Sequence, residues 1–190
     1  MCADVVSSGV VSSGMFVGSG QTLIVLSGGV VSSGTIAPGG LEMIENGGLD
    51  VSGFVSAGAA EFVMSGGLAR NGAIEGEVYV DAGGVVSATT VQNGGLLEIN
   101  YGGRAQDAVV ASGGTILVRA HGEVDGAYIQ ADGELMLSGG LASGGVVESS
   151  GTVVVSSGAV TSGVTLETGA LGLVIGGSAA GSIVSSGAYI

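Results

Sequence analysis

Apolar residues and glycines recur along the whole chain at a regular interval. Glycine turns, most of them Gly-Gly or Ser-Ser-Gly, divide the chain into ten similar units. The period is about 19 residues, and self-similarity at such a period is typical of solenoids, in which each repeat forms one stacked unit. The glycines that serve as the reference position of the ten units are Gly9, Gly29, Gly48, Gly67, Gly84, Gly103, Gly122, Gly140, Gly158 and Gly177.

Two columns of apolar residues recur at fixed distances from these turns. One column stands seven residues after the reference glycine, or eight in one unit, and the other stands four residues after a second glycine turn. We expect both columns to form ladders in the core. The first ladder is Phe16, Ile36, Val55, Ile74, Val91, Val110, Ile129, Val147, Leu166 and Val184. The second ladder is Ile24, Ile44, Phe62, Val80, Ile99, Val118, Leu137, Val155 and Leu173.

Around these columns the residues follow a period of two, as in Val85-x-Ser87-x-Thr89-x-Val91 and Leu97-x-Ile99. This period directs alternate side chains to one face of a β-strand. A helix is excluded, because glycine returns about every nine or ten residues and each glycine would cost about 1 kcal/mol in a helix interior. The pattern therefore predicts two short strands and two glycine turns in each unit.

A single unit is too small to fold alone. Ordering about 19 residues costs roughly 19–38 kcal/mol of backbone entropy, whereas burying two aliphatic side chains returns only about 3–6 kcal/mol. Coils stacked about 4.8 Å apart would pair their strands in parallel and bury both ladders. We therefore predict one domain over residues 1–190: an all-β, single-stranded parallel β-helix, or β-solenoid, of about ten coils. Its length would be about 48 Å, and its coiling right-handed, as parallel crossovers prefer.

The composition narrows the class of partner. Hydrophobic residues make up 46% of the chain and aromatic residues 4%, which suits many thin layers better than one thick core. A formal net charge of −13 opposes binding to nucleic acid and to anionic membranes. No stretch is long and apolar enough for a membrane helix, so we expect no membrane insertion of this segment. The first four residues lack the basic and apolar regions of an export signal.

Cys2 is the only cysteine, so no internal disulfide is expected. A terminal free thiol and an intermolecular bridge both stay open for this residue.

Units such as Gly-Gly-Val-Val-Ser-Ser-Gly-Thr-Ile (28–36) and Gly-Gly-Val-Val-Ser-Ala-Thr-Thr-Val-Gln-Asn-Gly-Gly (83–95) resemble the repeats of AIDA-type autotransporter adhesins. The likeness covers essentially the whole chain. It implies a parallel β-helical passenger displayed on the surface of a Gram-negative bacterium, where it takes part in adhesion and self-association.

The resemblance also implies a modification. In AIDA-type adhesins the repeats receive heptose on serine hydroxyls from a glycosyltransferase. Hydrogen bonding of the same serines to the turn backbone is an alternative role, and both roles are compatible within one serine pair. The matching Ser-Ser-Gly positions are Ser7, Ser8, Ser12, Ser13, Ser32, Ser33, Ser156, Ser157, Ser185 and Ser186.

We expect no catalytic residue, no cofactor and no metal site. The reference glycines follow one another at short and nearly even intervals, which leaves no room for the long loops that build the clefts of β-helical enzymes. His121 stands beside a glycine, outside any recognisable catalytic motif, and receives no role. An ice-binding array would need threonines in one flat column, and here they are scattered.

A Ca²⁺ site is a candidate on the acidic residues near the turns. These residues change column from unit to unit, so solvated charges that keep the rod soluble are preferred to metal ligands. The residues are Glu75, Glu77, Asp81, Glu123, Asp125, Asp132 and Glu134.

Two functions remain that share this fold. The first is a rigid extracellular stalk or adhesin that makes weak multivalent contacts with host or matrix components or with a sister cell. The second is a self-assembling structural protein whose solenoids stack end to end into a fibre. The repeat already runs at residues 5–9 and continues to 187–190 without a polar capping unit. This pattern suits a segment of a longer array, and it also suits end-to-end stacking.

Overall fold

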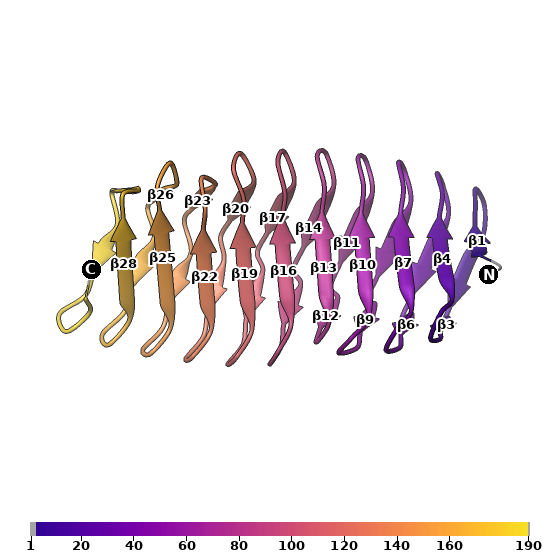
Figure 1. Ribbon diagram of the computed structural model, residues 1–190, viewed down its shortest axis with the longest axis horizontal. Coiled ribbons are helices and arrows are strands. Elements are labelled where there is room, and N and C mark those ends of the chain that lie inside the picture. The colour runs from indigo at the N-terminus through magenta and orange to yellow at the C-terminus, as the bar shows by residue number, and fades with distance from the viewer. Residues whose placement is uncertain (1–2, 190) are drawn as a thin grey trace.

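The computed structural model describes residues 3–189, which form ten coils stacked along one axis (Figure 1). Each coil contains three short strands, and the described residues include no helix. Strands of successive coils pair side by side into three ten-stranded sheets, named here sheets A, B and C, and all strand pairs are parallel. The predicted β-solenoid of about ten coils is confirmed, whereas its right-handed coiling stays a prediction. Cys2 lies outside the described residues.

The three strands of a coil follow one another in the order A, B, C. Sheet A contains β1 (Ala3–Val6), β4 (Thr22–Val25), β7 (Leu41–Ile44), β10 (Ala60–Val63), β13 (Glu77–Val80), β16 (Leu96–Ile99), β19 (Thr115–Val118), β22 (Glu134–Leu137), β25 (Thr152–Ser156) and β28 (Leu171–Ile175). Sheet B contains β2 (Val11–Ser13), β5 (Val30–Ser32), β8 (Leu49–Val51), β11 (Leu68–Arg70), β14 (Val85–Ser87), β17 (Arg104–Gln106), β20 (Glu123–Asp125), β23 (Leu141–Ser143), β26 (Val160–Ser162) and β29 (Ser178–Ala180). Sheet C contains β3 (Phe16–Val17), β6 (Thr35–Ile36), β9 (Phe54–Val55), β12 (Ala73–Ile74), β15 (Thr90–Val91), β18 (Val109–Val110), β21 (Tyr128–Ile129), β24 (Val146–Val147), β27 (Thr165–Leu166) and β30 (Ile183–Val184).

The core is one continuous column of side chains that runs along the inside of the solenoid. Most predicted ladder residues point into it. Val184 keeps its place in the column above Leu166 but is 42% exposed, because it lies in the last described coil. The ladder residues with at most 2% of their surface exposed are Ile36, Val55, Ile74, Val91, Val110, Ile129, Val147, Leu166, Ile44, Val80, Ile99, Val118, Leu137 and Val155.

Four of the predicted ladder residues point outward instead. Phe16 is 67% and Leu173 is 44% exposed, and Ile24 and Phe62 are half-buried. The strand register gives the inward positions of these coils to the next residue in each case. The residues that replace Phe16, Ile24, Phe62 and Leu173 in the core columns are Val17, Val25, Val63 and Val174.

These four residues were misassigned because, in the turn before each of them, another residue replaces one glycine of the Gly-Gly pair. In a regular turn the first glycine has positive φ, 73° at Gly28, and the second glycine is the reference. In the first unit Gly9 itself has a φ of 79°, so Val10 holds the reference position. The same replacement occurs at residues 20–21, 58–59 and 169–170. Because strand side chains alternate with a period of two, a miscount of one residue moves a side chain to the opposite face.

Each coil also has a third corner, between sheets B and C, which the glycine pattern did not reveal. One residue with left-handed backbone makes this corner, and φ is 51° at Ala88. It breaks the alternation, so that Val85 and Ser87 point outward whereas Thr89 and Val91 are buried. The prediction of two strands per unit is therefore wrong. The residues at this corner, mostly glycine or short polar residues that tolerate positive φ, are Gly14, Ser33, Ser52, Asn71, Ala88, Asp107, Gly126, Gly144, Gly163 and Gly181.

The second glycine of a Gly-Gly turn is required by close packing between coils. A Cβ atom at Gly29 would lie 2.3 Å from the carbonyl oxygen of Val6, and one at Gly48 would lie 2.3 Å from that of Val25. A side chain at such a position requires a local shift of the backbone.

No helix among the described residues has the length and hydrophobicity to cross a membrane.

Replacing Ile99 with aspartate should destabilise the solenoid by several kcal/mol, on the order of 3–5, because an unpaired charge would enter a fully buried ladder between Val80 and Val118. The matched control is Ser87→Asp, which places the same group on the outward face between Arg70 and Gln106. We expect the control to change the unfolding free energy by less than about 1 kcal/mol. Denaturant unfolding followed by circular dichroism measures both, and equal effects would contradict the inward and outward assignment.

Candidate functional site

The ten candidate acceptor serines lie at all three corners of the coil rather than in one column. Residues 7–8 and 156–157 lie where sheet A leads to sheet B, residues 12–13 and 32–33 precede or form the corner from sheet B to sheet C, and residues 185–186 follow sheet C. Six of them are exposed: Ser7, Ser8, Ser13, Ser33, Ser157 and Ser186. The other four, Ser12, Ser32, Ser156 and Ser185, are half-buried.

Further serines extend these rows, and most of them stand alone before a glycine pair, so the Ser-Ser-Gly pattern does not include them. Serines at the turn tips pack against a glycine of the next coil. A Cβ atom at Gly28 would lie 2.9 Å from Oγ of Ser8, and one at Gly47 would lie 2.7 Å from Oγ of Ser27. Because glycine has no side chain, it leaves the hydroxyl of the neighbouring serine accessible to solvent. The additional exposed serines at turns include Ser19, Ser27, Ser65, Ser112 and Ser138, as well as Ser149 and Ser150, which precede Gly151 in a further Ser-Ser-Gly turn.

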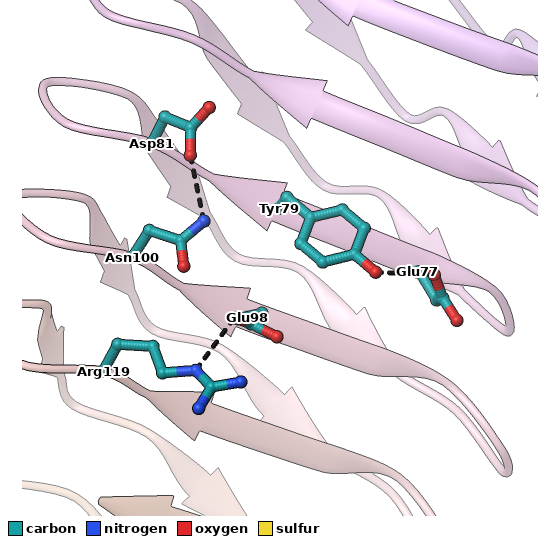
Figure 2. A network of polar contacts seen from close by, with 6 residues as sticks. All are labelled: Glu77, Tyr79, Asp81, Glu98, Asn100 and Arg119. Atoms are coloured by element: carbon teal, nitrogen blue, oxygen red, sulfur yellow. Dashed lines mark hydrogen bonds and ion pairs between the residues drawn. The ribbon is translucent and has the colours of Figure 1, made fainter. Parts of the chain in front are cut away.

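Two of the acidic residues considered for Ca²⁺, Glu77 and Asp81, form separate contacts at sheet A and the turn that follows it (Figure 2). Glu77 accepts a hydrogen bond from the Tyr79 hydroxyl at 2.7 Å, and this bond raises the pKa of Tyr79 to about 12. Asp81 accepts a hydrogen bond from Nδ2 of Asn100 at 2.9 Å. Glu77 and Asp81 therefore each have a partner of their own. None of the seven residues belongs to the converging acidic group found among the described residues.

Two ion pairs bridge neighbouring coils on the surface. Arg119 donates to Glu98 at 2.9 Å on sheet A, and Arg104 pairs with Glu123 on sheet B. His121 takes the positive-φ position of its turn, with φ at 59°, and its ring meets Tyr101 edge-on at a centroid distance of 5.0 Å. These contacts fix the residues as surface links between coils.

Three carboxyl groups lie inside the solenoid, and sequence reasoning gave them no role. Glu42 in β7 and Glu61 in β10 are neighbours in one inward column of sheet A. Asp50 in β8 belongs to the same coil as Glu42 and points inward from sheet B, below Ala69. The three residues are only 2–3% exposed. One oxygen from each lies within 4.8 Å of the other two, and this is the one such acidic group among the described residues. We call Glu42, Asp50 and Glu61 the core acid triad.

The surrounding residues are small enough to make room for the core acid triad. A Cβ atom at Gly53 would lie 2.1 Å from Oδ2 of Asp50, so the glycine is required for this side-chain position. On the other side, Ala69, Gly72 and Thr89 line a cavity of about 10 Å³ that Asp50 and Glu61 also border. Such a volume is close to the room that one water molecule needs.

The interior disfavours ionisation of all three groups. Burial, followed by the charge of Asp50, raises the pKa of Glu42 from 4.5 to about 8. Burial raises the pKa of Asp50 from 3.8 to about 6, although the backbone N–H groups of Val51 and Gly53 oppose the rise. Burial and the charges of the other two members raise the pKa of Glu61 well above 4.5. The cluster therefore retains protons near neutral pH unless another positive charge replaces them.

The chain is similar to the crystal structure of a hyper-glycosylated fragment of TibA, residues 55–350, whose glycosylation was catalysed by TibC. The TM-score is 0.63 at 25% sequence identity, over 99% of this chain and 91% of the fragment. The chain shares the fold of this glycosylated fragment. This similarity supports the AIDA-like repeat inferred from the sequence. No protein-family model and no curated protein matches the chain.

Stability should fall as pH rises through the range in which the core acid triad loses its protons. Because the pKa of Glu42 is raised from 4.5 to about 8, the folded chain binds more protons than the unfolded chain between these values. Its contribution to stability is therefore greatest below about pH 4 and is lost by about pH 8, with a decrease on the order of 5 kcal/mol at about 1.4 kcal/mol per pKa unit. Denaturant unfolding in EDTA at a series of pH values measures this slope.

The matched variants are Glu42→Gln and the exposed Glu167→Gln. The first should flatten the decrease with pH because it removes an ionisable group from the core, whereas the second should leave it unchanged. A wild-type chain that is equally stable at pH 5 and pH 8 in EDTA would contradict the prediction.

Proposed function

We propose that the chain is a rigid, non-catalytic stalk of an adhesin on the surface of a Gram-negative bacterium, glycosylated on the serines of its turns. The observation that carries this proposal is the similarity to a glycosylated adhesin fragment over 99% of the chain. The stalk role agrees with the architecture, because thirty short strands hold ten coils in one line (Figure 1). The partner enzyme would be a glycosyltransferase that acts on this chain as TibC acts on the TibA fragment.

The distribution of serines supports glycosylation along the long edges of the rod. Turns join sheet A to its neighbours at both ends of every strand, and they project along two edges of the solenoid (Figure 1). The exposed serines at these turns recur in register with the coils, as do Ser8 and Ser27. A transferase that recognises one coil would therefore meet a similar acceptor on the next coil.

The outer face of sheet A supports contacts with a second copy or with a host or matrix component. Met43, Phe62 and Tyr79 follow one another in one outward column, and the rings of Phe62 and Tyr79 stack at a centroid distance of 4.9 Å. These three side chains are half-buried and face outward, and apolar and aromatic surface of this kind is common at protein interfaces. Repetition along the rod would convert weak contacts into multivalent binding.

The alternative function is end-to-end stacking into a fibre. Sedimentation and negative-stain microscopy of the purified chain distinguish the two proposals. A stalk should stay monomeric at micromolar concentration, or associate side by side, whereas stacking should give filaments with an axial repeat of about 48 Å.

Co-expression with a glycosyltransferase of the TibC type should add several sugar units to the chain, and intact-protein mass spectrometry counts them. Peptide mapping should place the sugars on exposed turn serines such as Ser8, Ser27 and Ser157, and not on the half-buried Ser32. Replacing the three exposed serines with alanine should reduce the sugar count by up to three. An unmodified chain, or modification confined to Ser32, would contradict the proposed glycosylation.

Display of the chain on an unrelated surface carrier tests the adhesive role. Cells that carry the glycosylated chain should bind host cells or aggregate more than cells that carry the same chain with Phe62 and Tyr79 replaced by serine. Equal binding by both, at equal display, would contradict a role of this face in adhesion.

A further inference from the structure

The core acid triad lacks any cationic side chain that could neutralise it. The sequence contains three Lys and Arg residues in total, and all three are arginines: Arg70, Arg104 and Arg119. Arg104 and Arg119 form the surface ion pairs described above. Arg70 is exposed on the outer face of β11. An isolated buried carboxylate is strongly unfavourable, so the positive charge must come from protons or from a bound cation.

Two oxygen atoms of the triad also lack hydrogen-bond donors. Oε1 of Glu42 and Oδ1 of Asp50 are buried without a hydrogen-bond partner, and both residues are 2% exposed. Buried polar atoms in folded proteins are nearly always paired, so two unpaired acceptors in one cluster indicate a missing positive group. The oxygens come from two coils and from two sheets, which places them on different sides of a common point.

We propose that Glu42, Asp50 and Glu61 bind one divalent cation inside the solenoid, and that Ca²⁺ is the ion that fits best. The ligand atoms are all carboxylate oxygens, which suit Ca²⁺, Mg²⁺ or Mn²⁺ better than zinc or copper. One oxygen of each residue lies within 4.8 Å of the other two, so a single ion can contact all three. Ca²⁺ tolerates irregular oxygen coordination, whereas Mg²⁺ requires near-ideal octahedral geometry and usually keeps several waters. The adjoining cavity of about 10 Å³ would admit one water molecule as a further ligand.

Such an ion would connect two coils of the rod. Glu42 and Asp50 come from the coil of β7 and β8, and Glu61 comes from the coil of β10. Without the ion, loss of the protons from the three carboxyl groups would oppose close approach of these coils, whereas the ion would attract all three carboxylates to one point. Because the site is enclosed, the ion must enter before the two coils close, during folding. This inference is independent of the proposed glycosylation and adhesion.

The test refolds the purified chain from denaturant at pH 8 in millimolar Ca²⁺ or in EDTA and then removes free ions by gel filtration. Inductively coupled plasma mass spectrometry should find about one Ca²⁺ per chain after the first treatment. The melting temperature, measured in millimolar Ca²⁺ before gel filtration, should be about 5–10 °C higher than in EDTA, as expected for a free ion at roughly a hundred times its dissociation constant.

Two variants separate this site from the acidic surface. Glu61→Gln should reduce the bound Ca²⁺ at least tenfold and abolish the difference in melting temperature, whereas the exposed Glu167→Gln should bind as the wild type does. The metal content of the wild type decides the matter even if Glu61→Gln folds poorly. Wild-type protein without stoichiometric Ca²⁺ and with equal melting temperatures in Ca²⁺ and EDTA would overturn the proposal. Stoichiometric loading by Mg²⁺ but not by Ca²⁺ would overturn the choice of ion.

Discussion

Vertical stacking of equivalent backbone positions is the constraint on which the rest of this solenoid depends. The strands are two to five residues long, too short to persist as isolated hairpins. They hold because each one hydrogen-bonds to the equivalent strand of the coil on either side within a ten-stranded sheet. Val91, for example, lies between Ile74 and Val110 in the register of sheet C, and each of these residues belongs to an adjacent coil.

The same stacking decides where charge is tolerated. An outward column can alternate charges, and Arg104 lies directly beside Glu123 in the register of sheet B. An inward column has no access to water, so every polar residue in it needs a partner from the next coil or from the opposite sheet. The neighbour of Glu42 in the next coil is Glu61, which carries a charge of the same sign when ionised. In the core acid triad, the strand register therefore places like-charged groups next to each other, which is electrostatically unfavourable.

The repeat period made the fold and most core residues predictable from the sequence. Ile99 and Val118 follow from glycine spacing alone, because the Gly-Gly turn fixes the phase of the strand that comes after it. The phase was lost where one glycine is replaced, as at Gly58-Ala59. That slip placed Phe62 inside and consequently left Glu61 on the outside. The third corner could not be predicted from glycine pairs, since residues as different as Ala88 and Asp107 adopt the same left-handed backbone there.

The core acid triad could have been found in part. Glu42 stands two residues before Ile44, so strict alternation already places it inward. Asp50 offered no such signal, because alternation counted back from Val55 places it outward, and the left-handed corner at Ser52 reverses that phase. Its proximity to Glu42 depends on how sheets A and B face each other across the interior, which no local pattern contains.

Because successive coils stack in the same way, a solenoid of this kind can change its length during evolution by whole coils. Unequal crossing-over between similar repeats removes or adds a segment of about 19 residues, and every remaining ladder then closes on a neighbour of the same kind. Rod length is thus adjustable without a new fold. The coils that contribute Glu42, Asp50 and Glu61 are the exception: loss of either would leave buried carboxylates facing an ordinary aliphatic layer, so this pair of coils must be inherited together.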